Sequence, residues 1–215
     1  MVNKMREMLR HDLHGAARAL LGWELVSGGL RARIVETEAY HESEPGCHAF
    51  GRVTPRCQTM VTTPGTAYVY STYGNHWMLN VVAGEEGEAA AILIRAAIPL
   101  SGQEVMYKRR PKARRDEYLL SGPGKLAAAF GLSGEDDGTD LLDGSGLHLV
   151  AGSPPPEILC GKRIGLAKGK GDELPWRYVS WVDRNWVSAL KPPASRENFA
   201  NCESTGLWRF SPSAE

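Results

Sequence analysis

The sequence predicts an α+β protein whose strands are mostly antiparallel. Apolar and polar residues alternate in several short runs, and glycine-containing turns join these runs as they do in hairpins. Alanine-rich stretches bounded by glycine predict helices among the strands. The chain has 215 residues and no internal repeat, so we expect residues 1–215 to form a single domain.

Composition limits the classes of partner. Lysine plus arginine and aspartate plus glutamate number 25 each, so the formal net charge is zero, which argues against a histone-like protein. A local basic patch would still be enough to bind nucleic acid. The first twelve residues are polar and no run reaches the roughly 20 apolar residues that span a bilayer, so we expect no leader and no membrane partner. Four irregularly spaced cysteines fit a reduced cytoplasmic setting.

The first part of the chain predicts a helix, a hairpin and a long loop. Residues 11–22 are rich in alanine and end at glycine, which predicts a short helix. Residues 23–40 predict two strands around a turn at 27–29. Residues 41–65 are polar and contain several prolines and glycines. Loops of that length inside a compact domain are usually functional.

The remainder predicts a meander, two helical segments and short later strands. The meander strands are 66–73, 76–82 and 89–99. The helix-prone segments are 101–120 and 121–132, and the later strands are 146–150, 163–167 and 177–182. The tail from about residue 192 is polar, and we expect it to be loosely held.

The run RARIVETEAYHES, residues 31–43, carries two glutamates and a tyrosine on a predicted strand. Extended backbone alternates faces, so Ile34, Glu36, Glu38 and Tyr40 are predicted on one face. Two carboxylates on one face repel each other, so this arrangement needs a compensating role. For Glu36, solvation or a salt bridge with a nearby arginine, Arg31 or Arg33, is the expected role.

A flat slot for a planar aromatic ligand is predicted where this strand meets the following segments. The slot residues are Glu38, Tyr40, His48 and Tyr70. Aromatic rings stack on planar bases, and a carboxylate that they partly desolvate is a candidate general base toward water. Asn80 and Arg95 lie on later strands and can add polar contacts.

Tyr73 directly precedes the Gly74-Asn75 turn and is predicted at the tip of a hairpin. One interpretation is a partly exposed tyrosine without a specific role. The other is an aromatic wedge that inserts into a nucleic-acid partner, as in base-flipping proteins.

Two other patterns suggest weaker sites. LLSGPGKLAAAF lacks the residues of a phosphate loop, but free amides at this helix start together with Lys125 can form an anion site, and a simply capped helix is the alternative. The cluster of His41, Cys47, His48 and Cys57 matches no common zinc spacing, so no metal is expected.

Several long motifs, in order, resemble the alkyladenine (3-methyladenine, or methylpurine) DNA glycosylase family. They are RIVETEAY, HAFGRVTPR, PGTAYVYSTYGNHWMLNVV, AILIRAAIPL, LLSGPGKL and RIGLA followed by WRYVSWVDRNWVS. The resemblance implies a single domain with a curved antiparallel sheet flanked by helices and a protruding β-hairpin that inserts into DNA. We expect the protein to need no cofactor and to act in the cytoplasm, associated with the nucleoid, and a monomer is the simplest expectation.

The implied activity is that of a monofunctional DNA glycosylase in base excision repair. It would flip damaged purines out of double-stranded DNA: alkylated bases such as 3-methyladenine, with hypoxanthine and ethenoadenine. Glu38 matches the base that activates water for attack on C1′, and Arg95 matches a residue that orients this water and the flipped nucleotide. The motifs place no lysine to form a Schiff base, so strand cleavage is not expected.

The resemblance also assigns the base pocket. Tyr40 matches one stacking wall, and His48 and Tyr70 match the opposite wall. Asn80 matches a polar gatekeeper at the pocket floor. Tyr73 matches the residue that enters the minor groove and fills the gap left by the flipped nucleotide.

This chain departs from the family pattern at a few positions. Gly46 and Cys47 stand where small residues, often Ala-Ser, precede the loop histidine. Cys57 stands in an asparagine position, and Asn75 stands where an apolar residue is common. These departures concern substrate range and DNA contact rather than Glu38. The chain begins without a long N-terminal extension, as bacterial members do.

Two other functions remain open from the sequence: a damage-binding protein with weak or lost catalysis, and a hydrolase of free nucleosides.

Basic residues near the motifs are candidates for phosphate contacts, with ordinary solvated surface charge as the alternative. The candidates are Arg52, Arg56, Lys125, Arg163, Lys168 and Lys170.

Overall fold

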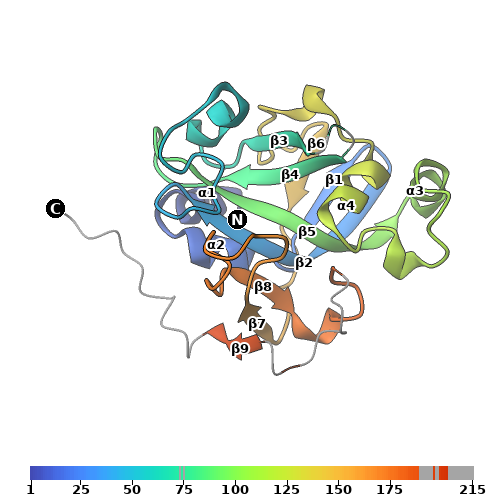
Figure 1. Cartoon of the computed structure of the whole chain (residues 1–215). Helices are drawn as coiled ribbons and strands as arrows, with labels where there is room; N and C mark the ends of the chain where they lie inside the picture. The colour runs from blue at the N-terminus through green and yellow to red at the C-terminus, as the bar shows by residue number, and fades with distance from the viewer. Residues whose placement is uncertain (73, 75, 189–195, 197–198, 203–215) are drawn as a thin grey trace.

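The computed structural model describes residues 1–72, 74, 76–188, 196 and 199–202 (Figure 1). Its α-helices are α1 (Val2–His11), α2 (Leu13–Ala19), α3 (Gln103–Arg109) and α4 (Pro123–Phe130). Its strands are β1 (Glu24–Ser27), β2 (Leu30–His41), β3 (Ala67–Thr72), β4 (His76–Val82), β5 (Ala90–Ser101), β6 (Leu147–Val150), β7 (Ile158–Gly161), β8 (Arg177–Ser180) and β9 (Phe199–Asn201). Short 3-10 helices are η1 (Pro55–Val61), η2 (Asp116–Tyr118), η3 (Gly134–Asp136) and η4 (Trp181–Asp183).

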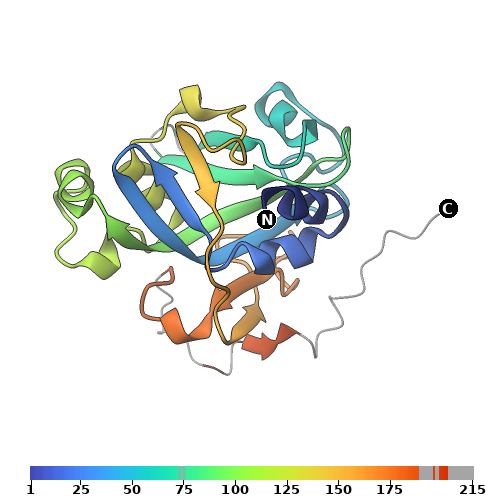
Figure 2. The ribbon, with the colours of Figure 1, turned by 180° about the vertical axis from the view of Figure 1, so that it is seen from behind.

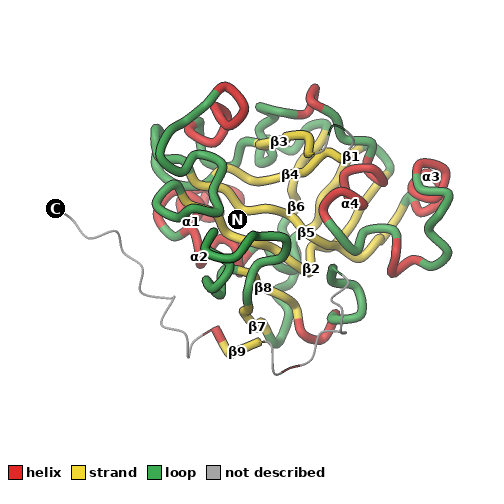
Figure 3. Tube along the Cα trace, in the orientation of Figure 1, coloured by secondary structure: helices red, strands yellow, loops and turns green. Residues whose placement is uncertain are grey.

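The described strands form one sheet, and each of its strand pairs is antiparallel. The main order is β3-β4-β5-β2-β8-β7-β9, and β1 pairs with both β2 and β6. The long strands β2 and β5 pair at its centre and connect the β3–β4 hairpin to β8 (Figures 1 and 3). The predicted α+β class, with a single mixed domain on an antiparallel sheet, is confirmed.

The predicted turn between β1 and β2 consists of Gly28 and Gly29, because Ser27 pairs directly with Leu30. Gly28 has a φ of 56°, a left-handed conformation that glycine adopts without a steric penalty. The predicted meander is likewise present as β3, β4 and β5.

Helices cover both faces of the sheet. Helix α4 lies in front of the strands in Figure 1, and α1 and α2 lie in front of them after a half turn, in Figure 2. Helix α4 packs on β4 and β5, and α2 packs on β2. The alanine-rich segments therefore form helices as predicted. Helix α1 was not predicted; it anchors itself through Met5 and Leu9, four residues apart and both buried.

Two predictions about the later part of the chain need correction. Residues 163–167 form a loop rather than a strand, and the strand lies just upstream as β7. The tail contains strand β9, which pairs with β7, so its described part is not loosely held. These errors share a cause: β7 and β9 are short strands whose formation depends on pairing partners distant in sequence.

Candidate functional site

A β-bulge in β2 decides which residues face the site. The pairing register with β5 shifts between Ile34 and Glu36, and Val35 is the extra residue. Ile34 therefore packs in the main core together with Ala39. The prediction that Ile34 shares a face with Glu38 is wrong, because one inserted residue reverses the alternation.

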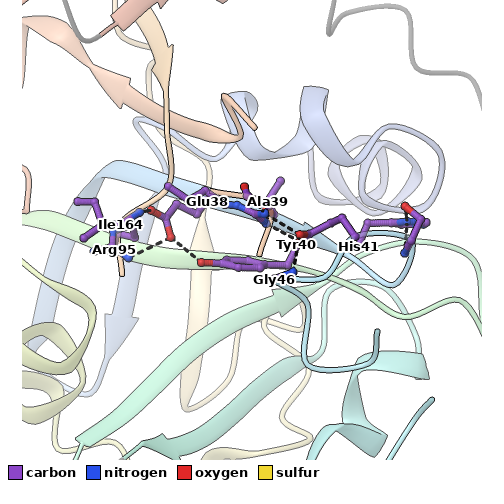
Figure 4. Close-up of polar contacts among 11 residues, drawn as sticks. Glu38, Ala39, Tyr40, His41, Gly46, Arg95 and Ile164 are labelled. Carbon is purple, nitrogen blue, oxygen red and sulfur yellow. Dashed lines mark hydrogen bonds and ion pairs between the residues drawn. The ribbon is translucent and has the colours of Figure 1, made fainter. Parts of the chain in front are cut away.

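Glu38 is completely buried and accepts hydrogen bonds from three donors (Figure 4). The Tyr40 hydroxyl lies 2.8 Å from Oε2, and Nη1 of Arg95 lies 3.0 Å from the same oxygen. The backbone amide of Ile164 donates to Oε1 over 2.7 Å. Together these donors compensate for the hydration that the carboxylate loses on burial.

Glu36 is also completely buried, which overturns its expected role as a solvated or Arg31- or Arg33-paired residue. Those two arginines pair with other acids, Glu24 and Asp183 respectively. The partners of Glu36 come instead from distant segments. The ion-pair and hydrogen-bond distances to it are 2.6 Å from Arg177 Nε, 2.6 Å from the Ser188 amide and 3.3 Å from Arg95 Nε.

The pKa of Glu36 reflects these partners. Burial raises this pKa, whereas the Arg177 and Arg95 guanidinium groups and the Ser188 amide lower it. The lowering is larger than the raising, so the pKa of Glu36 lies below its ordinary value. Glu36 is therefore held as a buried anion, and Arg95 links it to Glu38.

A cavity of about 300 Å³ lies next to Glu38. Its lining includes Tyr40, His48, Tyr68, Tyr70, Asn80, Leu93, Arg95, Pro123 and Ile164. All four predicted ring and amide residues of the pocket are thus brought together with Arg95. The Glu38 carboxylate lies directly behind three lining residues, Tyr40, Arg95 and Ile164, to which it is hydrogen-bonded.

One wall of the cavity is an aromatic cluster. Tyr70 stacks on Tyr68 with ring centroids 5.2 Å apart, and His48 meets Tyr70 edge-on at 4.5 Å. Nδ1 of His48 and the hydroxyl of Tyr68 are 2.9 Å apart. Such a wall offers flat apolar surface with a few polar atoms, which suits a planar heterocycle.

Protonation states follow from this environment. Burial, and then the Glu38 carboxylate, raise the pKa of Tyr40 well above its ordinary value, so the phenol keeps its proton and remains a donor. Burial and the Arg56 guanidinium lower the pKa of His48 below 6.5, so the ring is neutral near neutral pH.

Asn80 is 3% exposed and donates to the Tyr68 carbonyl over 3.0 Å, which orients its amide at the cavity.

Some site residues were not predicted. Tyr68 was placed on the same face as Tyr70 by alternation, a signal that could have identified it. The Ile164 amide gave no such signal, because a backbone group in a loop has no sequence pattern that marks it as a donor to a residue 126 positions away.

The candidate phosphate-binding residues differ in their surroundings. Arg52 and Arg56 are exposed, and Arg56 lies over the Tyr70 ring at 5.4 Å. Lys125 is half-buried and donates to the Ser121 hydroxyl over 3.1 Å. Arg163 is 5% exposed, which contradicts its assignment to the surface.

Lys168 and Lys170 are exposed, as expected of surface lysines. Tyr73 and Asn75 lie outside the described residues.

Across residues 1–72, 74, 76–188, 196 and 199–202, no group of three or more histidine, cysteine, aspartate or glutamate side chains could hold a metal ion. None of the described helices is both long and apolar enough to cross a membrane.

Comparison with known proteins gives a consistent result. Residues 7–184 match the family model of methylpurine-DNA glycosylase (MPG). Three curated relatives are each named "Putative 3-methyladenine DNA glycosylase". The one from Rhodopseudomonas palustris (strain BisB18) is 44% identical over 173 residues, which cover 80% of this chain and 84% of the relative. The one from Rubrobacter xylanophilus is 45% identical over 170 residues, which cover 77% of this chain and 87% of the relative. The one from Burkholderia cenocepacia is 43% identical over 168 residues, which cover 76% of this chain and 80% of the relative.

Proposed function

Because this chain belongs to the methylpurine-DNA glycosylase family, we propose that it is a monofunctional DNA glycosylase that removes damaged purines from double-stranded DNA. The observation that carries the proposal is the position of Glu38, a buried carboxylate with three donors, immediately behind an aromatic cavity. A carboxylate and a stacking pocket are the two parts that hydrolysis of an N-glycosidic bond requires.

The proposed reaction is displacement by water. The water oxygen bonds to C1′ of the deoxyribose, the bond from C1′ to the purine nitrogen breaks, and the base leaves with the bonding electrons. Glu38 accepts the proton from water, and its negative charge stabilises the oxocarbenium character of the sugar. The Glu38 carboxylate is in contact with Tyr40, Arg95 and Ile164. In this proposal, water reaches the carboxylate from the cavity when one of these contacts rearranges locally.

The base is held by the cavity walls. In this proposal the flipped purine lies between Tyr40 and the wall of His48 and Tyr70, and Asn80 contacts its edge. Tyr73 fills the gap in the duplex. Flipping costs a few kcal/mol and costs less for a weakly paired base, so selection begins before chemistry.

The substrates are proposed from the family and the reaction. Alkylated purines such as 3-methyladenine are good leaving groups, and the enzyme is expected to act on hypoxanthine and 1,N6-ethenoadenine as well. The product is an abasic site in an uncut strand, because no lysine is assigned to a Schiff base. The enzyme acts as a monomer and without a cofactor.

The test is single-turnover base release from duplexes that contain one of these three lesions. Glu38→Gln should lower release by roughly 10²–10⁴-fold, since it removes the proton acceptor, while binding to the lesion duplex persists. Glu104→Gln, an exposed glutamate on α3, is the matched control and should release base at the wild-type rate. Unchanged release by Glu38→Gln would refute the catalytic assignment.

Base release from lesion duplexes and from free nucleosides separates the two other functions. A damage-binding protein would bind the lesion duplex but release no base in the wild type. A nucleoside hydrolase would cleave free nucleosides, and Tyr73→Ala would have no effect, because a free nucleoside leaves no gap in a duplex to fill.

A further inference from the structure

Arg163 is a buried arginine immediately before Ile164, in the loop between β7 and β8. Nη1 donates to the Ala39 carbonyl over 2.9 Å and to Oε1 of Glu44 over 2.6 Å. Nη2 donates to Oε2 of Glu44 over 2.7 Å and to the Gly171 carbonyl over 3.0 Å. The pair with Glu44 is therefore bidentate, the geometry that most restricts both side chains.

The guanidinium also lies over two aromatic rings. Its central carbon lies 4.5 Å from the centroid of Tyr40 and 5.3 Å from that of Trp176. Tyr40 lines the cavity and Arg163 does not, so the arginine supports the Tyr40 ring from outside the cavity.

The surrounding backbone leaves little room for this pair to move. A Cβ on Gly46 would lie 2.9 Å from Oε2 of Glu44 and 3.0 Å from Nη2 of Arg163. A Cβ on Gly171 would lie 2.4 Å and 2.5 Å from the same two atoms. Glycines at both positions thus allow two loops to close on the ion pair.

The pair connects strand β2 and the loop that follows it to the loop between β7 and β8, which is distant in sequence. Glu44 begins the loop that carries His48, and its carboxylate also accepts from the Gly46 amide over 2.7 Å. Arg163 contacts the Tyr40 ring, and the next residue, Ile164, donates its amide to Glu38. A buried ion pair is often no more stabilising than apolar residues of the same size, so stability alone does not account for it.

We propose that Arg163, held by Glu44, is a positioning residue that fixes the Tyr40 wall and the Ile164 amide relative to Glu38. This inference rests on the proposed function, since it concerns the rate of base release. It excludes a phosphate contact for Arg163, because the side chain is 5% exposed and both terminal nitrogens of its guanidinium donate to protein acceptors.

The test compares Arg163→Met, Arg163→Lys and Glu44→Gln with the wild type on a lesion duplex. The rate constant for base release is measured with saturating enzyme and divided by the folded fraction, and the duplex dissociation constant and its salt dependence are measured separately. Arg163→Met should slow release by roughly 10- to 100-fold, because small displacements in an active site have effects of that size. Arg163→Lys should be intermediate, because lysine keeps the charge but not the planar fork.

The matched control is Arg6→Met. Nη2 of Arg6 donates to both carboxylate oxygens of Asp140, at 2.9 and 2.8 Å, and this pair joins α1 to a loop and does not line the cavity. This variant should lower the melting temperature without changing the rate per folded molecule. Glu44→Gln keeps the side-chain size. If Arg163→Met does not fold, the rate of base release by Glu44→Gln tests the inference instead.

The inference is supported if release slows while the dissociation constant and its salt dependence stay at wild-type values. It is overturned if the Arg163 and Glu44 variants behave as Arg6→Met does, or if they change only DNA affinity. A wild type that releases no base from any of the lesions would instead refute the proposed function, and this inference with it.

Discussion

Arg95 lies 3.0 Å from Glu38, and both side chains are almost fully removed from solvent. The same guanidinium lies 3.3 Å from Glu36, so one cation stands between two buried carboxylates. This arrangement explains why β2 tolerates two glutamates on adjacent positions of one face. Their repulsion is offset by a shared positive charge from the neighbouring strand β5.

We expect Arg95→Met to destabilise the protein strongly. Removing one member of a buried charge set leaves uncompensated charge in the interior, at a cost of roughly 3–5 kcal/mol. Urea unfolding at neutral pH measures this loss. Arg31→Met removes an arginine from the more exposed pair with Glu24 and should change the free energy of unfolding by less than about 1 kcal/mol. Equal losses in both variants would contradict the shared role of Arg95.

We expect Glu36→Gln to change how stability depends on pH. The folded pKa of Glu36 lies below its ordinary value of 4.5, so its ion pairs contribute stability above that pH. This contribution is lost as the pH falls below 4.5 toward the folded-state pKa, when the carboxylate is protonated. The difference in unfolding free energy between wild type and Glu36→Gln should therefore be constant between neutral pH and about pH 5.5 and shrink in more acidic solution.

Denaturant titrations over that pH series check the prediction. Glu24→Gln is the control, because its carboxylate belongs to a partly exposed pair. A stability difference that stays constant down to about pH 3 would show that folding does not lower the pKa of Glu36.

We expect the His48 ring to titrate below 6.5, its ordinary pKa. Burial disfavours the charged ring, and the Arg56 guanidinium adds repulsion. Arg56→Ala should therefore raise the His48 pKa, whereas Arg52→Ala, an exposed arginine on the same loop, should leave it unchanged. An NMR titration of the ring protons measures both effects, and a wild-type midpoint above 6.5 would contradict the prediction.

We expect DNA binding to weaken as the salt concentration increases. Binding releases cations from the DNA phosphates, and this release is less favourable when the surrounding salt is more concentrated. If Arg52, Arg56 and Lys125 contact phosphates, each alanine variant should reduce the slope of log affinity against log salt by about one. Fluorescence anisotropy with an undamaged duplex measures the slope. A variant with the wild-type slope would remove that residue from the proposed DNA surface.

The fold was largely predictable where signals are local. The Gly28-Gly29 turn, the β3–β4–β5 meander and the alanine-rich helices each depend on a few consecutive residues, and each is present. The errors concern elements whose formation depends on distant partners. Strand β9 forms against β7, and helix α1 is held by Met5 and Leu9, which are buried in the core.

The candidate site shows the same division. Tyr40, His48, Tyr70, Asn80 and Arg95 were named from the sequence, and all five line one cavity. Their catalytic and DNA-binding roles remain predictions. The burial of Glu36 was missed because its partners, Arg177 and Ser188, come from more than a hundred positions away.

The sequence alone determined which chemical groups are available: a carboxylate at position 38, rings at 40, 48 and 70, and a strand whose period of two puts Glu38 and Tyr40 on one face. Only the tertiary structure decided how those groups are held. The bulge at Val35 set the face on which Glu38 lies, and loops from distant segments supplied the Ile164 amide and the Arg163–Glu44 pair. Alternation acts between neighbouring residues, whereas buried charges and backbone donors find their partners only when the chain is folded.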